Sequence, residues 1–86
     1  MLMSIFKRSL LDKIRPLTEM KVAREAVGLS IKDLASMTDC STQTIMRIEL
    51  AIFTPHRLIR EKICTALGAS MDQLFDEEGR AIIVPR

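Results

Sequence analysis

One stretch of this 86-residue chain, residues 31–49, constrains the fold more than any other; its sequence is IKDLASMTDCSTQTIMRIE. Ser30 and Ser41 each stand directly before an amphipathic run, as N-caps whose hydroxyl accepts a backbone N–H that the first helical turn leaves unpaired. Between the two runs, Asp39 is a residue type that tolerates the left-handed conformation of a turn. The stretch therefore predicts two short helices joined by a tight turn.

Both predicted helices have one apolar face. Leu34 and Ala35 form this face in the first helix, with Ile31 one turn before them. In the second helix, Ile45 and Ile48 form it, three residues apart. Because Ala35 is small, it permits the close crossing of two helices that a helix-turn-helix requires.

The outer face of the second helix carries hydrogen-bonding side chains and no acid: Thr42, Gln43, Thr44 and Arg47. Such a face is either an ordinary solvated surface or a surface that reads base edges in the major groove of DNA. Gln can pair with adenine, Arg with guanine, and a Thr methyl can touch the methyl group of thymine. Because a helix and a tight turn precede this face, the second interpretation is favoured.

With these residues the segment resembles the helix-turn-helix of the lambda-repressor-like (Xre) family. The resemblance covers roughly residues 17–75, most of the chain, through Arg24-Glu25, Gly28-Leu29-Ser30, Ile48-Glu49, Pro55, Leu67-Gly68 and Met71-Asp72-Gln73-Leu74-Phe75. It implies an all-α, five-helix DNA-binding domain. It also implies that the Arg24-Glu25 pair supplies a structural salt bridge, with Glu49 as the candidate partner, rather than a DNA contact.

The resemblance further implies phosphate contacts near the helix N-termini that flank the recognition helix, where this chain has Lys32, His56 and Arg57. The candidate DNA-binding residues are therefore Lys32, Ser41, Thr42, Gln43, Thr44, Arg47, His56 and Arg57.

The loop after the recognition helix departs from the family pattern. The family has a polar residue, a Gly and basic residues there, whereas residues 50–53 read Leu-Ala-Ile-Phe. This apolar loop is either a contact surface or a segment that folds back over the core. Smaller departures are Ile31 in place of a phosphate-contacting Gln, Asp39 in place of the turn Gly, and Thr38 at a normally aliphatic position.

The amino-acid composition of the chain argues against some classes of nucleic-acid-binding protein and is compatible with others. Aromatic residues make up 3% of the chain, which argues against single-strand binders that stack bases on aromatic side chains. The net charge of +2 is a weak argument for a nucleic-acid partner. However, basic residues outnumber acidic ones in residues 1–24, whereas residues 71–79 contain acidic residues and no basic ones. Such a distribution is compatible with one face on DNA and the other in solvent.

The sequence predicts neither a catalytic site nor a bound cofactor. Cys40, Cys64 and the single His56 lack the spacing of a metal site, so two free thiols are expected, as in a reducing cytoplasm. A nucleophile paired with a base and a Gly-rich phosphate loop are both missing from the sequence pattern. Because the chain also has no membrane-spanning apolar run and no signal peptide, we expect a cytoplasmic protein without a membrane partner.

The remaining segments extend this domain at both ends. Residues 1–16 predict an N-terminal extension with an amphipathic helix over Ser4–Ile14, which could be a flexible or packed extension, a dimer contact or a basic arm on phosphate. The helix-turn-helix domain is expected at residues 17–76, and residues 77–86 form a C-terminal tail. The β-branched run Ala81–Val84 predicts a short strand in this tail.

Three further helices complete the predicted domain. The first spans Leu17–Val27. The fourth begins at Pro55 after Thr54 as N-cap and runs to about Leu67, with Leu58 among its inward residues. Ser70 then caps a short last helix.

The sequence thus predicts a transcriptional regulator, expected to be a repressor, that binds double-stranded DNA in the major groove as a homodimer on a palindromic operator. A lone strand is not stable, so residues 81–84 are expected to pair with a second copy or another protein, or to lie disordered. The alternative function is a protein-interaction module, such as an antitoxin or adaptor, that binds a partner protein through the 50–53 loop and this strand.

Overall fold

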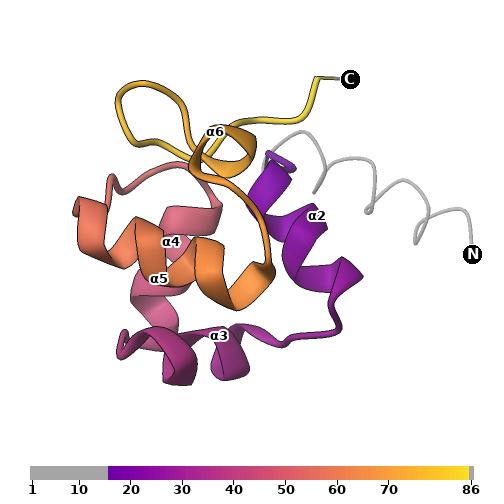
Figure 1. Ribbon diagram of the computed structural model, residues 1–86, viewed down its shortest axis with the longest axis vertical. Coiled ribbons are helices and arrows are strands. Elements are labelled where there is room, and N and C mark those ends of the chain that lie inside the picture. Colours follow the sequence, from indigo (N-terminus) through magenta and orange to yellow (C-terminus); the bar gives the residue numbers. More distant parts are fainter. Residues whose placement is uncertain (1–15, 86) are drawn as a thin grey trace, which may run out of the picture.

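Five helices run through residues 16–85, the part of the chain that the computed structural model describes. They are α2 (Glu19–Ala26), α3 (Ile31–Thr38), α4 (Thr42–Glu49), α5 (Arg57–Leu67) and α6 (Met71–Leu74). In Figure 1, α3 lies across the lower end of the molecule, α5 passes in front of α4, and α6 lies at the top beside the C-terminal segment. The fold is all-α, as predicted, and the helix predicted over Ser4–Ile14 lies outside the described residues. None of these five helices has the length and apolarity that crossing a membrane requires.

Side chains fix where α2 and α3 begin. The hydroxyl of Thr18 accepts the N–H of Lys21 at 3.3 Å, and Thr18 itself is extended, so α2 starts at Glu19 rather than at the predicted Leu17. At α3, the hydroxyl of Ser30 accepts the N–H of Asp33, and the Asp33 carboxylate accepts the N–H of Ser30, both at 3.0 Å. This reciprocal capping box confirms Ser30 as the N-cap.

Left-handed residues end three of the helices. Asp39 closes α3 with φ 56° and ψ 36°, which confirms the conformation predicted for it. Gly28 follows α2 with φ 77°, and Gly68 closes α5 with φ 65°. The chain can therefore reverse direction sharply after each helix.

The predicted start of α5 was wrong by two residues. His56 is the extended N-cap, so the helix begins at Arg57 instead of at Pro55. Pro55 is instead buried, and its carbonyl accepts the Arg60 Nη1–H at 2.7 Å. Leu58, predicted to point inward, is 63% exposed, because it lies five positions before the buried Ile63 and so falls off the core-facing side of the helix.

The core is formed where the apolar faces of the helices meet. Its fully buried apolar side chains, at most 2% exposed, are Met20, Leu34, Ile45, Ile48, Ile63, Leu74 and Ala81. Thr38 is also buried, at a position where the resemblance implies an aliphatic residue. Its hydroxyl donates to the carbonyls of Leu34 and Ala35 within α3, so the polar atom is satisfied without a partner from another helix.

Residues 81–84 do not form the predicted strand. They make only isolated antiparallel bridges, between Ala81 and Phe75 and between Ile83 and Thr18. Their backbone groups pair with the same chain: Glu19 N–H donates to Ile82 C=O at 2.9 Å, Ile82 N–H to Leu74 C=O at 3.0 Å, and Val84 N–H to Leu17 C=O at 2.8 Å. The expectation that this segment needs a partner from a second chain was therefore wrong.

A tight turn leads into this segment. Asp76 Oδ1 accepts the N–H groups of Glu78 and Arg80, and Gly79 has φ 85°. Gly79 is buried against the guanidinium of Arg60, where a side chain would collide with it. The turn therefore lies against Arg60 of α5.

Candidate nucleic-acid interface

The helix-turn-helix consists of α3, the turn at residues 39–41, and α4. The N–H of Cys40 donates to the carbonyl of Ala35 at 3.0 Å, and the side chain of Cys40 is half-buried. Ser41 then caps α4: its hydroxyl accepts the N–H of Thr44 at 3.0 Å, which confirms the second predicted N-cap. Cys40 and Cys64 are both free thiols, and burial raises the pKa of the Cys64 thiol.

The outer face of α4 brings together three of the predicted base-reading residues. Thr42, Gln43 and Arg47 are exposed, while Ile45 and Ile48 on the opposite face are fully buried. No acidic side chain interrupts the exposed face, so its donors and acceptors are open to a ligand. The arrangement has the hydrogen-bonding inventory that base edges in a major groove require.

Thr44 lies at the margin of this face. It is half-buried, and its hydroxyl accepts a hydrogen bond of 2.8 Å from the hydroxyl of Ser41. Ser41 is exposed, but both hydroxyls take part in capping α4. The two residues therefore shape the N-terminal end of α4.

Met46 was missed by the sequence reasoning because its side chain is apolar. It is 45% exposed and follows Thr42 by four positions and Gln43 by three, which are the spacings of one helical turn. Those spacings alone could have placed it on the outer face.

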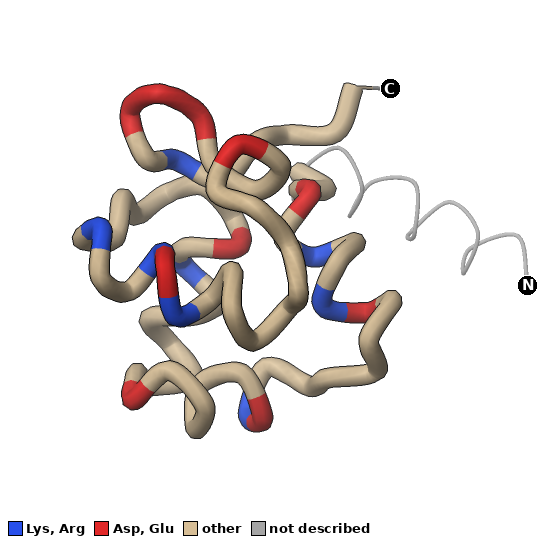
Figure 2. Tube along the Cα trace, viewed as in Figure 1, with Lys and Arg blue, Asp and Glu red and all other residues tan. Residues whose placement is uncertain are grey.

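The three residues predicted to contact phosphates are all exposed. Lys32 lies in the first turn of α3, His56 is the N-cap of α5, and Arg57 is the first residue of α5. Arg57 also pairs with Glu61 at 3.1 Å, but both side chains are largely exposed, so solvent screens this ion pair and a phosphate can compete with it. In Figure 2 the acidic turn at 76–78 lies at the upper end of the molecule, opposite α3 at the lower end.

The loop at residues 50–53 holds two apolar side chains in solvent. Ile52 is 70% exposed and Phe53 is 43% exposed, while Leu50 is half-buried. Ala51 has φ 62°, a left-handed conformation that is unusual for a residue with a side chain. Of the two alternatives, Ile52 and Phe53 therefore do not fold back over the core.

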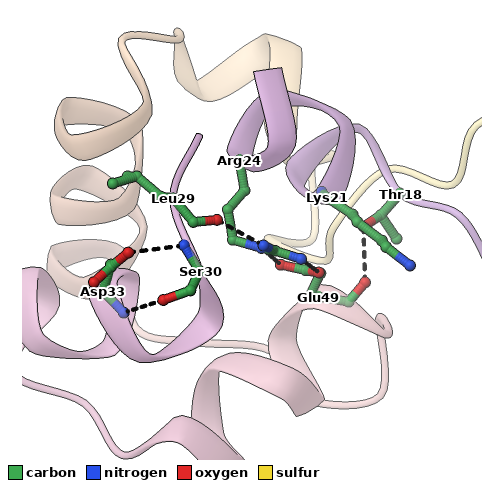
Figure 3. A network of polar contacts seen from close by, with 7 residues as sticks. All are labelled: Thr18, Lys21, Arg24, Leu29, Ser30, Asp33 and Glu49. Atoms are coloured by element: carbon green, nitrogen blue, oxygen red, sulfur yellow. Dashed lines mark hydrogen bonds and ion pairs between the residues drawn. The ribbon is translucent and has the colours of Figure 1, made fainter. Parts of the chain in front are cut away.

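A buried polar network fixes the C-terminal end of α4 (Figure 3). Arg24 donates from Nε and Nη2 to the two carboxylate oxygens of Glu49, both at 2.9 Å, and from Nη1 to the carbonyl of Leu29 at 2.7 Å. The hydrogen bond to Glu49 holds the pKa of Arg24 above its ordinary value. Thr18 adds a bond from its hydroxyl to the Glu49 carbonyl at 2.8 Å.

This network confirms the predicted salt bridge to Glu49 and shows which elements the salt bridge joins. It connects α2, the segment before α3, and the end of α4 through one guanidinium. Because a bidentate pair fixes direction as well as distance, the network sets the orientation of α4 relative to α2.

A family model described as helix-turn-helix matches residues 20–74. The matched range begins within α2 and ends at the last residue of α6, so it includes the whole α3–turn–α4 unit. Neither the curated proteins nor the solved structures compared with the chain gave a match.

Proposed function

The chain belongs to the helix-turn-helix family of the lambda-repressor-like (Xre) type, and from that premise we propose that it is a repressor that binds a palindromic operator as a homodimer. DNA binding and the regulation of transcription are the general function of this family. The observation that carries the proposal is the exposed, acid-free face of α4 with Thr42, Gln43 and Arg47.

In the proposed complex, α4 lies in the major groove with its first turn toward the base edges. Gln43 pairs with adenine and Arg47 with guanine, while the methyl group of Thr42 can touch a thymine methyl. Ser41 and Thr44 lie at the helix N-terminus, where the helix dipole favours a phosphate. Lys32, His56 and Arg57 are proposed to contact the phosphates that flank the groove.

One helix-turn-helix reads only a few base pairs, so useful specificity requires two copies. A two-fold symmetric dimer places two recognition helices on half-sites about one helical turn apart, and its operator is palindromic. Such a dimer excludes other proteins from the DNA that it occupies, which is the proposed basis of repression.

Binding-site selection from random duplex DNA tests this function. We expect a palindromic consensus, and Gln43→Ala or Arg47→Ala should weaken binding to it by about 1–3 kcal/mol. Thr65→Ala is a suitable control, because Thr65 is an exposed residue of α5 whose hydroxyl donates only to the Glu61 carbonyl in its own helix. Equal losses of Gln43→Ala on the consensus and on random DNA would show that Gln43 does not read sequence.

Loss of a phosphate contact should affect binding differently from loss of a base contact. Lys32→Gln and Arg57→Gln should each weaken binding to all sequences alike and should reduce the slope of log affinity against log salt by about one, because each removes one cation from a phosphate. Arg80→Gln makes the same change of charge on the exposed C-terminal turn and should leave the slope unchanged. If neither variant differs from the Arg80 control, these residues do not contact phosphate.

The second candidate function, a protein-interaction module, is favoured by one observation, the exposure of Ile52 and Phe53. Apolar side chains held in solvent next to one another are typical of contact surfaces. A selection experiment that enriches no DNA sequence would favour this function over the first.

A further inference from the structure

Met46 lies on the outer face of α4, but the proposed function assigns it no role. An α-helix turns by about 100° per residue, so Met46 lies between Thr42 and Gln43 when the helix is viewed along its axis. It is 45% exposed, while its sequence neighbour Ile45 is fully buried. Met46 is therefore central to the exposed face and does not belong to the core.

The surroundings of Met46 leave its side chain free to reach a ligand. It is 45% exposed and borders an open surface hollow of about 160 Å³ that Ile31, Leu50 and two residues of α2, Lys21 and Arg24, also line. A methionine side chain has three flexible torsions and a polarizable thioether, so it adapts to the shape of an apolar partner. Its sulfur is only a weak acceptor, and therefore the contacts that it can offer are mainly apolar.

Base edges in a major groove present one apolar group, the 5-methyl group of thymine. We propose that Met46 is a specificity-determining residue that selects thymine by packing its thioether against that methyl group. The inference rests on the proposed function, because it requires α4 to lie in a major groove. It adds an apolar readout to the hydrogen bonds proposed for Gln43 and Arg47.

The geometry limits which thymine is selected. Met46 follows Gln43 by three residues, a rise of about 4.5 Å along the helix. Successive base pairs rise by about 3.4 Å. The thymine therefore belongs to the base pair that Gln43 contacts or to an adjacent one.

Replacing thymine by uracil in the selected duplex tests the contact, because it removes the methyl group and leaves base pairing unchanged. Each thymine is replaced in turn, and the affinity of the full-length chain is measured for the wild type, for Met46→Ala and for Thr42→Ser. The last variant is the matched control, because it removes the other methyl group that could touch thymine from this face. Burying one methyl group corresponds to about fourfold in affinity.

We expect uracil at one position near the Gln43 contact to weaken the wild type about fourfold and to leave Met46→Ala unaffected. Thr42→Ser should keep the fourfold loss at that position. Two results overturn the inference: a wild type that is insensitive to uracil at each of these positions, or a Met46→Ala variant that keeps the sensitivity. If Met46→Ala weakens binding to random and selected DNA equally, Met46 contacts the DNA backbone and the inference is also wrong.

The same experiment separates this inference from the function on which it rests. A selection that yields no preferred sequence overturns the proposed function, and the thymine contact with it. A selected palindrome without coupling between Met46 and any thymine methyl overturns only the contact.

Discussion

Arg24 makes three hydrogen bonds inside the protein, two to the Glu49 carboxylate and one to the Leu29 carbonyl. Its side chain is 10% exposed and that of Glu49 is 7% exposed. Little water reaches either charge, so each is stabilised mainly by the other. Removing one partner of a buried pair leaves an uncompensated charge. We expect Glu49→Ala to lower the free energy of unfolding by about 3–5 kcal/mol, as measured by chemical denaturation.

A double replacement separates the cost of a lone charge from the value of the pair. Arg24→Met combined with Glu49→Leu removes both charges, so it should destabilise the fold less than Glu49→Ala alone. A double variant that is the less stable of the two would show that the ion pair itself stabilises the fold. If Glu49→Ala leaves the free energy of unfolding unchanged, the buried charge of Arg24 does not depend on Glu49.

The pKa of the Asp33 carboxyl is held below its ordinary value of 3.8, chiefly because this carboxylate accepts the backbone N–H of Ser30. A pKa lowered by folding contributes stability above the unfolded-state pKa, and this stability is lost as pH falls through the folded-state pKa. The wild type should therefore melt above Asp33→Ala at neutral pH, and the difference in Tm should shrink as the solution is acidified through and below pH 3.8. A difference in Tm that stays constant with pH would exclude the charged capping box.

At the scale of elements, the turn between α4 and α5 is held in a conformation that its sequence disfavours. Ala51 has φ 62°, which costs a residue with a side chain about 1–2 kcal/mol. Ala51→Gly should therefore raise the free energy of unfolding by about 1 kcal/mol, after the entropic cost of glycine. Asp39→Gly, at φ 56°, is the comparison and should gain less, because Asp tolerates this conformation better than Ala does. A loss of stability in Ala51→Gly would contradict the strain.

The helix starts that the sequence predicted correctly depend on local interactions. The capping box joins Ser30 to a residue three positions away, and Ser41 caps α4 over the same distance. The start of α5 could not be predicted from neighbouring residues, because it depends on the burial of Pro55 and on the hydrogen bond from Arg60 to the Pro55 carbonyl. Position in the tertiary structure outweighed the preference of proline for the first helical turn.

The candidate site was only partly predictable for a related reason. The polar residues on α4 directly suggested a face that reads DNA. Met46 is an apolar residue of a type common in protein cores, and only its spacing from Thr42 and Gln43 places it on the exposed face. Thr44 has a polar side chain, but its bond with Ser41 assigns it to the cap. The Arg24 pair with Glu49 spans 25 positions, and the resemblance to the family indicated it where local pattern could not.

At the scale of the whole molecule, the C-terminal segment closes the fold. Ala81 is buried in the core, and three backbone hydrogen bonds fix residues 82–84 to Leu17, Glu19 and Leu74. A homodimer therefore does not need this segment to satisfy unpaired backbone groups, which was the reason for expecting it to pair with a second copy. The side chain of Ile83, which is 54% exposed, remains available to a second chain.

Truncation after Glu78 should consequently destabilise each subunit. The truncation removes the three backbone hydrogen bonds of residues 82–84, the two backbone bonds that Gly79 and Arg80 make with Asp76, and the buried Ala81 side chain. It should lower the free energy of unfolding by about 2–4 kcal/mol, as measured by chemical denaturation. Ile83→Ser is the control, because it keeps the backbone bonds and changes only a side chain that is 54% exposed. We expect Ile83→Ser to unfold at the same denaturant concentration as the full-length chain and to sediment with the same dimerisation constant. A truncated chain that is as stable as the full chain would contradict this role of the segment. An Ile83→Ser variant that folds normally but sediments as a monomer would show that residues 81–84 form part of the dimer interface.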